Sequence, residues 1–122
     1  MFESILHSSV IVQDTKVSLD FYNGILGMEI DHNRPDLGYP GAWLNIGKQQ
    51  IHLLELMNPD PTINRPVHGG RDRHTAIATS QFEQLMKTLS ANKISYTLSK
   101  SGRKALFCRD PDGNALEFIC SE

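Results

Sequence analysis

Hydrophobic and polar residues alternate in several short runs of the chain, which is the pattern typical of β-strands. The alternation is clear at residues 5–12 and returns at residues 73–79. Further extended runs predict strands at residues 28–32, 42–46, 50–56, 94–98, 104–109 and 115–120. Turn-forming sequences separate run 42–46 from run 50–56 and run 104–109 from run 115–120, so each of these two pairs is expected to form a hairpin.

Two segments change from a period of two to a helical period. Val17, Phe21 and Ile25 recur every four residues, which predicts a helix with one apolar stripe. Asp14 is expected to cap its N-terminus, and Gly27 is expected to end it. The segment after residue 79 predicts a second helix.

The second helix is expected to start at a capping box formed by Ser80 and Glu83. Its apolar stripe consists of Phe82, Leu85, Met86 and Leu89. The predicted order of elements is therefore β-α-β-β-β, written twice, and the fold class is α+β.

The two halves also match in the placing of particular side chains. His7 opens the first strand of one half and His74 opens that of the other, 67 residues later (74 − 7). His52 and Glu117 lie on the last strands, 65 residues apart (117 − 52). This correspondence predicts an internal repeat of one structural module.

The boundaries follow from composition. Module one is expected to cover about residues 1–57 and module two about residues 73–122, joined by a linker rich in proline and glycine at about residues 58–72. Each module is too small to bury its own strands, so we expect the two to pack together as one domain. The pairing is open to two forms, within one chain or exchanged between two chains.

Composition excludes several classes of function. The chain has 122 residues and a net charge of −2, which gives no reason to expect nucleic acid or a membrane surface as a partner. It contains no apolar run of about 20 residues and shows no secretory signal. Two cysteines form no disulfide framework, and we expect reduced thiols in a cytoplasmic protein.

Four side chains are candidates for binding a metal: His7, His52, His74 and Glu117. Each lies opposite a mainly apolar row of its strand, so all four are expected on the sheet face away from the helices. A single histidine on a strand is an ordinary surface or core residue, but four potential ligands at matching positions of a repeat indicate one site. Such a set suits a divalent Zn, Ni, Co, Mn or Fe ion.

Several of these residues resemble a known family. The segments 21–27 (FYNGILG) and 110–114 (DPDGN), together with His7, His74 and Glu117, resemble the vicinal oxygen chelate superfamily. That superfamily includes glyoxalase I, fosfomycin-resistance enzymes, extradiol dioxygenases and bleomycin-resistance proteins. The resemblance covers nearly the whole chain.

The resemblance implies paired βαβββ modules that form a cupped mixed sheet, with helices on the convex side and a metal inside. It assigns the four ligand positions to His7, His52, His74 and Glu117. The chain departs from glyoxalase I at the second position, where that enzyme normally has Glu or Gln. A homodimer and a small-molecule substrate are also implied.

The leading hypothesis is a metal-dependent, glyoxalase-like lyase or isomerase acting on a small α-oxo compound or its thiol adduct. Glu117 is the one carboxylate of the set and the expected catalytic residue. A non-haem iron dioxygenase and a non-catalytic drug-binding protein are the alternatives. We interpret the 110–114 segment as a turn, and His32 and His68 as surface residues. Trp43, Tyr39 and Phe107 are either pocket walls or core, and among four arginines one or two are candidates to clamp an anionic substrate: Arg65, Arg71, Arg73 and Arg103.

Overall fold

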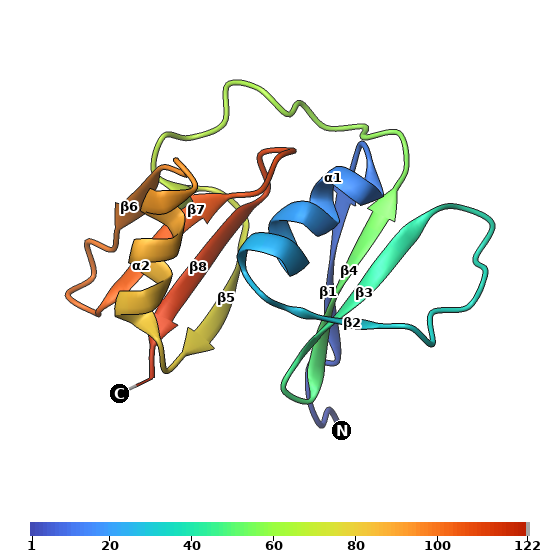
Figure 1. Cartoon of the computed structure of the whole chain (residues 1–122), viewed down its shortest axis with the longest axis horizontal. Helices are drawn as coiled ribbons and strands as arrows, with labels where there is room; N and C mark the ends of the chain where they lie inside the picture. Colours follow the sequence, from blue (N-terminus) through green and yellow to red (C-terminus); the bar gives the residue numbers. More distant parts are fainter. Residues whose placement is uncertain (122) are drawn as a thin grey trace. The chain divides into compact units, whose positions relative to one another are not determined.

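The computed structural model describes residues 1–121 and divides into two compact units, one ending at Pro59 and the other starting at Asp60. The boundary lies inside the segment expected to be a linker. Each unit contains a four-stranded mixed sheet with a helix after its first strand, in the order βαβββ (Figure 1). The α+β class and the repeated module are therefore confirmed.

The first module has the strand order β1-β4-β3-β2, with β1 parallel to β4 and the other pairs antiparallel. Its helical segment packs on β3 and β4. The elements are β1 (His7–Val12), α1 (Thr15–Leu19), η1 (Asp20–Ile25), β2 (Glu29–Asp31), β3 (Gly41–Ile46) and β4 (Gln49–Glu55).

The second module repeats this topology, with the order β5-β8-β7-β6 and β5 parallel to β8. Its helix packs on β8. The elements are η2 (Gly69–Arg71), β5 (His74–Thr79), α2 (Phe82–Ala91), β6 (Tyr96–Leu98), β7 (Ala105–Arg109) and β8 (Ala115–Cys120).

The strand registers of the two modules are equivalent. In the first module His52 of β4 pairs with Ser9 of β1, and in the second Glu117 of β8 pairs with Ala76 of β5. Ser9 and Ala76 each lie two residues after the histidine that opens their strand. The sequence repeat is therefore a repeat of hydrogen-bonding register as well.

The first helix departs from a regular α-helix. Asp14 caps it as expected, with its Oδ1 accepting from the backbone N–H groups of residues 16 and 17. From Asp20 the helix continues as a π-helix, and Phe21 and Tyr22 are buried there. The stripe predicted from Val17 was wrong at that residue, because Ser18 is fully buried and Val17 is half exposed.

The capping box expected at the second helix was wrong. The helix begins at Phe82, its N-cap is Gln81, and no side chain bonds the first turn. The Oγ1 of Thr79 instead accepts from the N–H of Gln81, so the chain turns before Ser80 can act as a cap.

The apolar rows opposite the four candidate ligands form much of each module's core. Ile51 and Leu53 in β4, and Leu116 and Phe118 in β8, are at most 4% exposed. Leu6 precedes β1 and is 69% exposed, so it is not part of this core. Burial on one face therefore leaves the other face of each sheet to the candidate ligands.

Two further expectations are settled by the fold. Both cysteines are free thiols. Asp110 is buried and closes the β7–β8 turn, because its carboxylate accepts from the backbone N–H groups of Asp112 and Asn114.

Within residues 1–121, no helix combines the length and apolar character needed to cross a membrane.

Candidate metal centre

In the second module, His74 and Glu117 meet on one face of the sheet. His74 opens β5, and Glu117 lies on the adjacent strand β8, opposite Phe107 of β7. The Nε2 atom of His74 is 3.3 Å from the Oε1 atom of Glu117. The two candidate ligands of the second module are therefore close neighbours in the structure.

The ring of His74 is held in one tautomer by the main chain. Its Nδ1–H donates to the carbonyl oxygen of Asp72 at 2.9 Å, so in the neutral ring the lone pair lies on Nε2, the atom that faces Glu117. Ligating histidines commonly donate their second N–H to a backbone carbonyl in this way.

Asp72 is itself fixed by two arginines. Arg65 and Arg109 both pair with its carboxylate, and their hydrogen bonds hold the pKa of Asp72 well below its usual range, with Arg65 making the largest contribution. Arg109 also donates to two backbone carbonyls. This anchored residue places the carbonyl that orients His74.

Glu117 is only 3% exposed, and nitrogen atoms of two side chains face its carboxylate. Its Oε1 faces His74, and its Oε2 accepts from Nη2 of Arg103 at 3.4 Å. A buried carboxylate requires such partners, because burial without them carries a large desolvation cost.

The separation of the two candidate donor atoms fits one metal ion. Two ligands with metal bonds of about 2.1 Å lie roughly 3.0–3.4 Å apart at octahedral to tetrahedral angles. The His74–Glu117 separation of 3.3 Å falls in that range. A neutral imidazole nitrogen beside a carboxylate oxygen is also a donor set that divalent transition metals accept.

His68 is a site residue that sequence reasoning placed on the surface. Its Nδ1 accepts from the N–H of Gly70, and its Nε2–H donates to the carbonyl of Leu98. Both ring nitrogens are therefore hydrogen-bonded, and His68 lines the cavity beside His74 and Glu117 without a nitrogen free to bind a metal. The ring of Phe107 contacts the rings of both His68 and His74, with centroids 5.0 Å and 5.2 Å away.

A pair of glycines allows this packing. A Cβ atom on Gly70 would come within 3.0–3.1 Å of His68 and Phe107, and one on Gly69 within 3.1 Å of Phe107. The Gly-Gly pair after His68 was the sequence signal that this end of the linker packs against the site.

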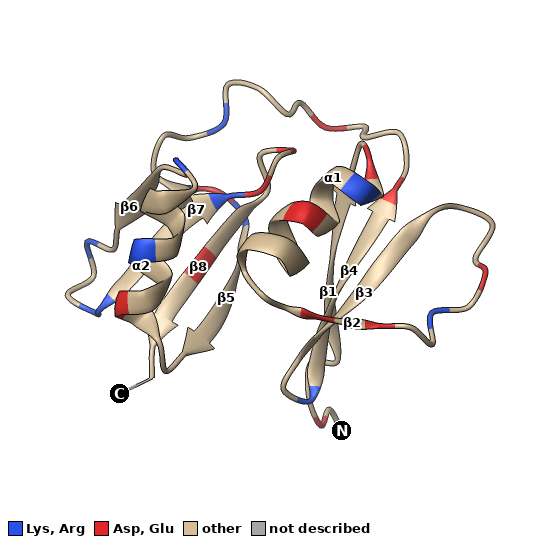
Figure 2. Ribbon diagram, in the orientation of Figure 1, with Lys and Arg blue, Asp and Glu red and all other residues tan. Residues whose placement is uncertain are grey.

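A cavity of about 310 Å³ opens beside these residues, at the lower end of the usual range for ligand sites, about 300–1,000 Å³. His74, Glu117 and Phe107 form part of its lining, and three cationic side chains contribute the rest of its charge: Arg71, Lys100 and Arg103. Figure 2 shows basic positions on the loop between β6 and β7 and an acidic position on β8.

In the first module, His7 and His52 also lie together, but as a stack. Their ring centroids are 3.9 Å apart with 12° between the planes, and Trp43 stacks on the other side of His52 at 4.5 Å and 9°. A nitrogen binds a metal in the plane of its ring, and two stacked parallel planes share no such point. Joint binding by this pair therefore requires one ring to rotate.

A polar network holds His52. Its Nε2–H donates to Oε1 of Gln50 at 2.8 Å, and Nε2 of Gln50 donates to Asp31 and Asn45. Burial, followed by the positive charges of His7 and Arg34, lowers the pKa of His52 despite the opposing charge of Asp31. The neutral ring is thereby favoured, which is the form that binds metals.

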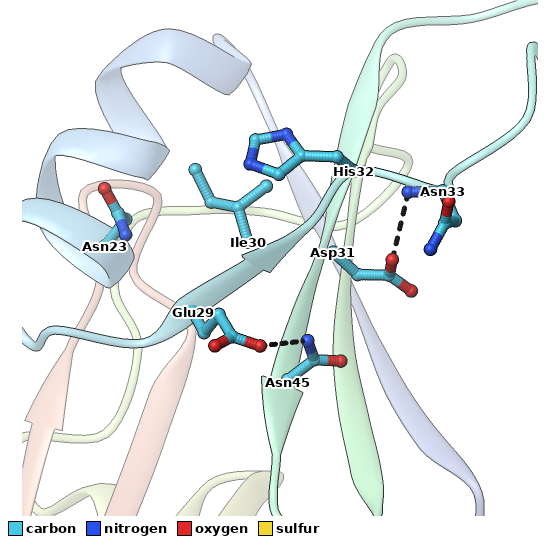
Figure 3. Close-up of a pocket in the computed structure, with 7 residues that line it drawn as sticks. All are labelled: Asn23, Glu29, Ile30, Asp31, His32, Asn33 and Asn45. Atoms are coloured by element: carbon cyan, nitrogen blue, oxygen red, sulfur yellow. Dashed lines mark hydrogen bonds between the residues drawn. The ribbon is translucent and has the colours of Figure 1, made fainter.

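The acidic end of this network borders a second cavity of about 710 Å³ (Figure 3). There Glu29 accepts from Asn45, and Asp31 accepts from the N–H of Asn33. These carboxylates are hydrogen-bonded to neighbouring amides and are not deeply buried. We therefore do not assign a binding site to this second cavity.

The structure thus brings the four predicted ligands together as two pairs, one in each module. Within residues 1–121, no cluster of three or more His, Cys, Asp or Glu side chains suited to a metal ion forms. Binding of one ion by all four residues stays a prediction.

Comparison with known proteins identifies the family. The sequence model of the "Glyoxalase/Bleomycin resistance protein/Dioxygenase superfamily" matches residues 4–118. The chain belongs to this superfamily. The resemblance seen in the sequence is therefore confirmed.

One relative is similar in sequence, and two solved structures are similar in fold. "Glyoxylase I 4" from Arabidopsis thaliana is 31% identical over 97% of this chain and 70% of that protein. A glyoxalase family protein from Bacillus anthracis superposes with a TM-score of 0.82 at 21% identity, covering 100% of this chain and 98% of that one. The fosfomycin resistance protein of Listeria monocytogenes superposes with a TM-score of 0.77 at 15% identity, covering 98% and 91%.

Proposed function

We propose that this chain is a metal-dependent lyase or isomerase of the glyoxalase type. Its substrate would be a small molecule with two neighbouring oxygen atoms, such as an α-oxo compound or its thiol adduct. The observation that carries the proposal is the pairing of His74 Nε2 with Glu117 Oε1 at 3.3 Å, with the histidine tautomer set by the carbonyl of Asp72. The similarity to a plant protein named as a glyoxalase supports it.

The proposed ligands are His74 and Glu117 from the second module and His7 and His52 from the first. The His74–Glu117 pair already has the spacing of two ligands of one ion. The His7–His52 pair would join it after rotation of one ring out of the stack. A divalent ion held there would supply Lewis-acid polarisation of the substrate oxygens.

The side chains themselves supply the remaining chemistry. Glu117 is the one carboxylate lining this cavity among the described residues, and we assign it the movement of the substrate proton at a carboxylate oxygen. Arg103 donates to the other oxygen and so helps to hold the carboxylate in position. Phe107 is buried and is the cross-strand partner of Glu117, and we expect its ring to limit the access of water to the carboxylate.

The test combines metal analysis with an activity assay. Protein purified without chelator is expected to contain a divalent metal in stoichiometric amount and to isomerise the hemithioacetal of methylglyoxal and glutathione. Glu117→Gln keeps the shape of the side chain but removes its charge, so we expect metal affinity to fall at least tenfold and turnover to be lost.

The matched control is Glu83→Gln, an exposed carboxylate on α2 that pairs with Lys104. This variant is expected to bind metal and turn over as the unchanged protein does. Stoichiometric metal without turnover on any α-oxo substrate would keep the site and reject the reaction. Absence of metal binding at micromolar concentrations would reject both.

A further inference from the structure

The cavity beside His74 and Glu117 has an excess of positive charge. Arg71, Lys100 and Arg103 line it, and Glu117 is the one acidic side chain in its lining among the described residues. Arg103 is 59% exposed on its side chain and Glu117 only 4%, so the carboxylate neutralises one cation at the floor and leaves the rim basic. A divalent ion at the floor would increase the positive charge further.

The basic rim is preorganised rather than a random surface cluster. Ser99 and Ser101 share a hydrogen bond of 2.8 Å between their hydroxyl oxygens. The hydroxyl of Ser101 accepts from both the backbone N–H and the Nε of Arg103, at 3.3 and 3.4 Å. The loop therefore holds the guanidinium of Arg103 over the cavity while its Nη2 reaches Glu117.

We propose that the substrate of this site carries a small oxyanion, a carboxylate or a phosphate-type group, that docks on the 99–103 loop and Arg71. This inference deepens the proposed function, on which it rests for the chemistry at Glu117. The anion would compensate the positive rim, and the substrate oxygens would then reach His74 and Glu117 in the same small cavity. Arginine and lysine are the side chains that recognise such groups, and a partly enclosed cavity strengthens the attraction.

The test measures binding of simple anions to the metal-free full-length chain by two-dimensional ¹H–¹⁵N NMR at constant ionic strength. Acetate and methylphosphonate are the two probes, and ethylene glycol is the neutral control. We expect at least one anion to shift the amide signals of Gly70 and residues 99–103 in a saturable manner. Saturation by one probe alone identifies the oxyanion class.

A double variant and a matched control make the test specific. Lys100→Gln with Arg103→Gln is expected to raise the Kd of the anion at least tenfold. Arg73→Gln removes an exposed cation of the same module that pairs with Asp60 outside the cavity, and it should change Kd less than twofold. Because all of these side chains are exposed, the fold should be retained.

The inference is overturned if neither anion shifts these amides, or if the double variant binds as tightly as the unchanged chain. Metal binding is measured on the same samples and separates this result from the fate of the proposed function. Metal binding without anion binding rejects the oxyanion proposal and leaves the proposed function standing. Anion binding without metal binding keeps the oxyanion site and rejects the metal-dependent reaction.

Discussion

Asp72 connects the stability of the second module with the orientation of its candidate ligand. Its carboxylate receives Arg65 and Arg109, while its main-chain carbonyl receives the ring of His74. The side chain of Asp72 is 6% exposed and those of the two arginines 22% and 25%. The ion pairs are therefore shielded more than ordinary surface pairs, and removal of their shared charge should be costly.

We expect Asp72→Asn to lower the free energy of unfolding by roughly 2 kcal/mol at pH 7 and to weaken metal binding by displacing the carbonyl. The pKa of Asp72 is lowered in the folded state, so its contribution is present above its usual value of 3.8 and is lost as pH falls below it. Urea unfolding between pH 7 and pH 3 measures the difference in unfolding free energy between the unchanged protein and this variant. The difference should become smaller below about pH 4. Asp60→Asn, in an exposed pair with Arg73, should cost less than about 0.5 kcal/mol. Equal losses for the two variants would contradict the assignment.

The two thiols provide a second measurement on single residues. Burial, with a smaller contribution from the charge of Asp110, raises the pKa of Cys108 to about 12, whereas Cys120 is partly exposed. Because the thiolate is the reactive form, the folded chain at pH 8 should react with Ellman's reagent at Cys120 at least tenfold faster than at Cys108. Both thiols should react quickly in urea. Two equally fast thiols in the folded chain would contradict the burial of Cys108.

At the scale of elements, two glycines of the first module differ in the space available for a side chain. A Cβ atom on Gly41 of β3 would lie 2.2 Å from the carbonyl oxygen of Leu53, a backbone atom that cannot move without shifting β4. At Gly24 in η1, the nearest atom to an added Cβ is 4.0 Å away. One position thus requires glycine, and the other only tolerates it.

We expect Gly41→Ala to destabilise the chain by about 2–3 kcal/mol, because the strands must separate to admit the methyl group. Gly24→Ala serves as its partner variant and should stabilise by about 0.5–1 kcal/mol, since alanine restricts the unfolded chain. Thermal unfolding of both variants gives the comparison. A stable Gly41→Ala protein would show that β3 and β4 approach less closely than described.

The elements differ in how well the sequence predicted them. The strand at residues 115–120 was predicted at its exact bounds, because a short, mainly apolar run that follows a turn-forming segment is typical of a strand. The π-helical continuation after Asp20 was missed, because Phe21 and Tyr22 remain buried in either helical form. The cap at Ser80 was also wrong, since a cap depends on a backbone turn that composition alone does not fix.

The candidate site was predicted to a similar extent. The His74–Glu117 pair followed from matching positions in a repeat, because equal register in two modules places equal residues on equal faces. The packing of His68 at the cavity and the contact of Arg103 with Glu117 did not follow. Each depends on contacts with residues 14 or more positions away, which no local pattern records. The stacking of His7 on His52 likewise depends on side-chain rotation rather than on register.

At the scale of the whole molecule, the central question is whether one ion uses both modules. Each module contributes one pair of candidate ligands, and only the pair in the second already has ligand spacing. Two models of metal binding make different predictions for variants of the first module. Binding by the second module alone would leave the first module's histidines without effect, whereas binding by all four residues would make metal affinity depend on both pairs.

We propose the shared site and expect the double variant His7→Ala with His52→Ala to lose most of the metal-induced rise in Tm. A ligand present at 100 times its Kd stabilises a protein by about 2.7 kcal/mol, so a tenfold weaker Kd is readily measured as a smaller shift. His32→Ala removes an exposed histidine of the same module and should keep the full shift, which controls for the loss of a surface imidazole. His74→Ala should abolish the shift in either case. A full metal-induced shift in the His7/His52 variant would show that the second module holds the ion alone, and the two histidines of the first module would then remain as a stacked pair with Trp43 and no part in binding.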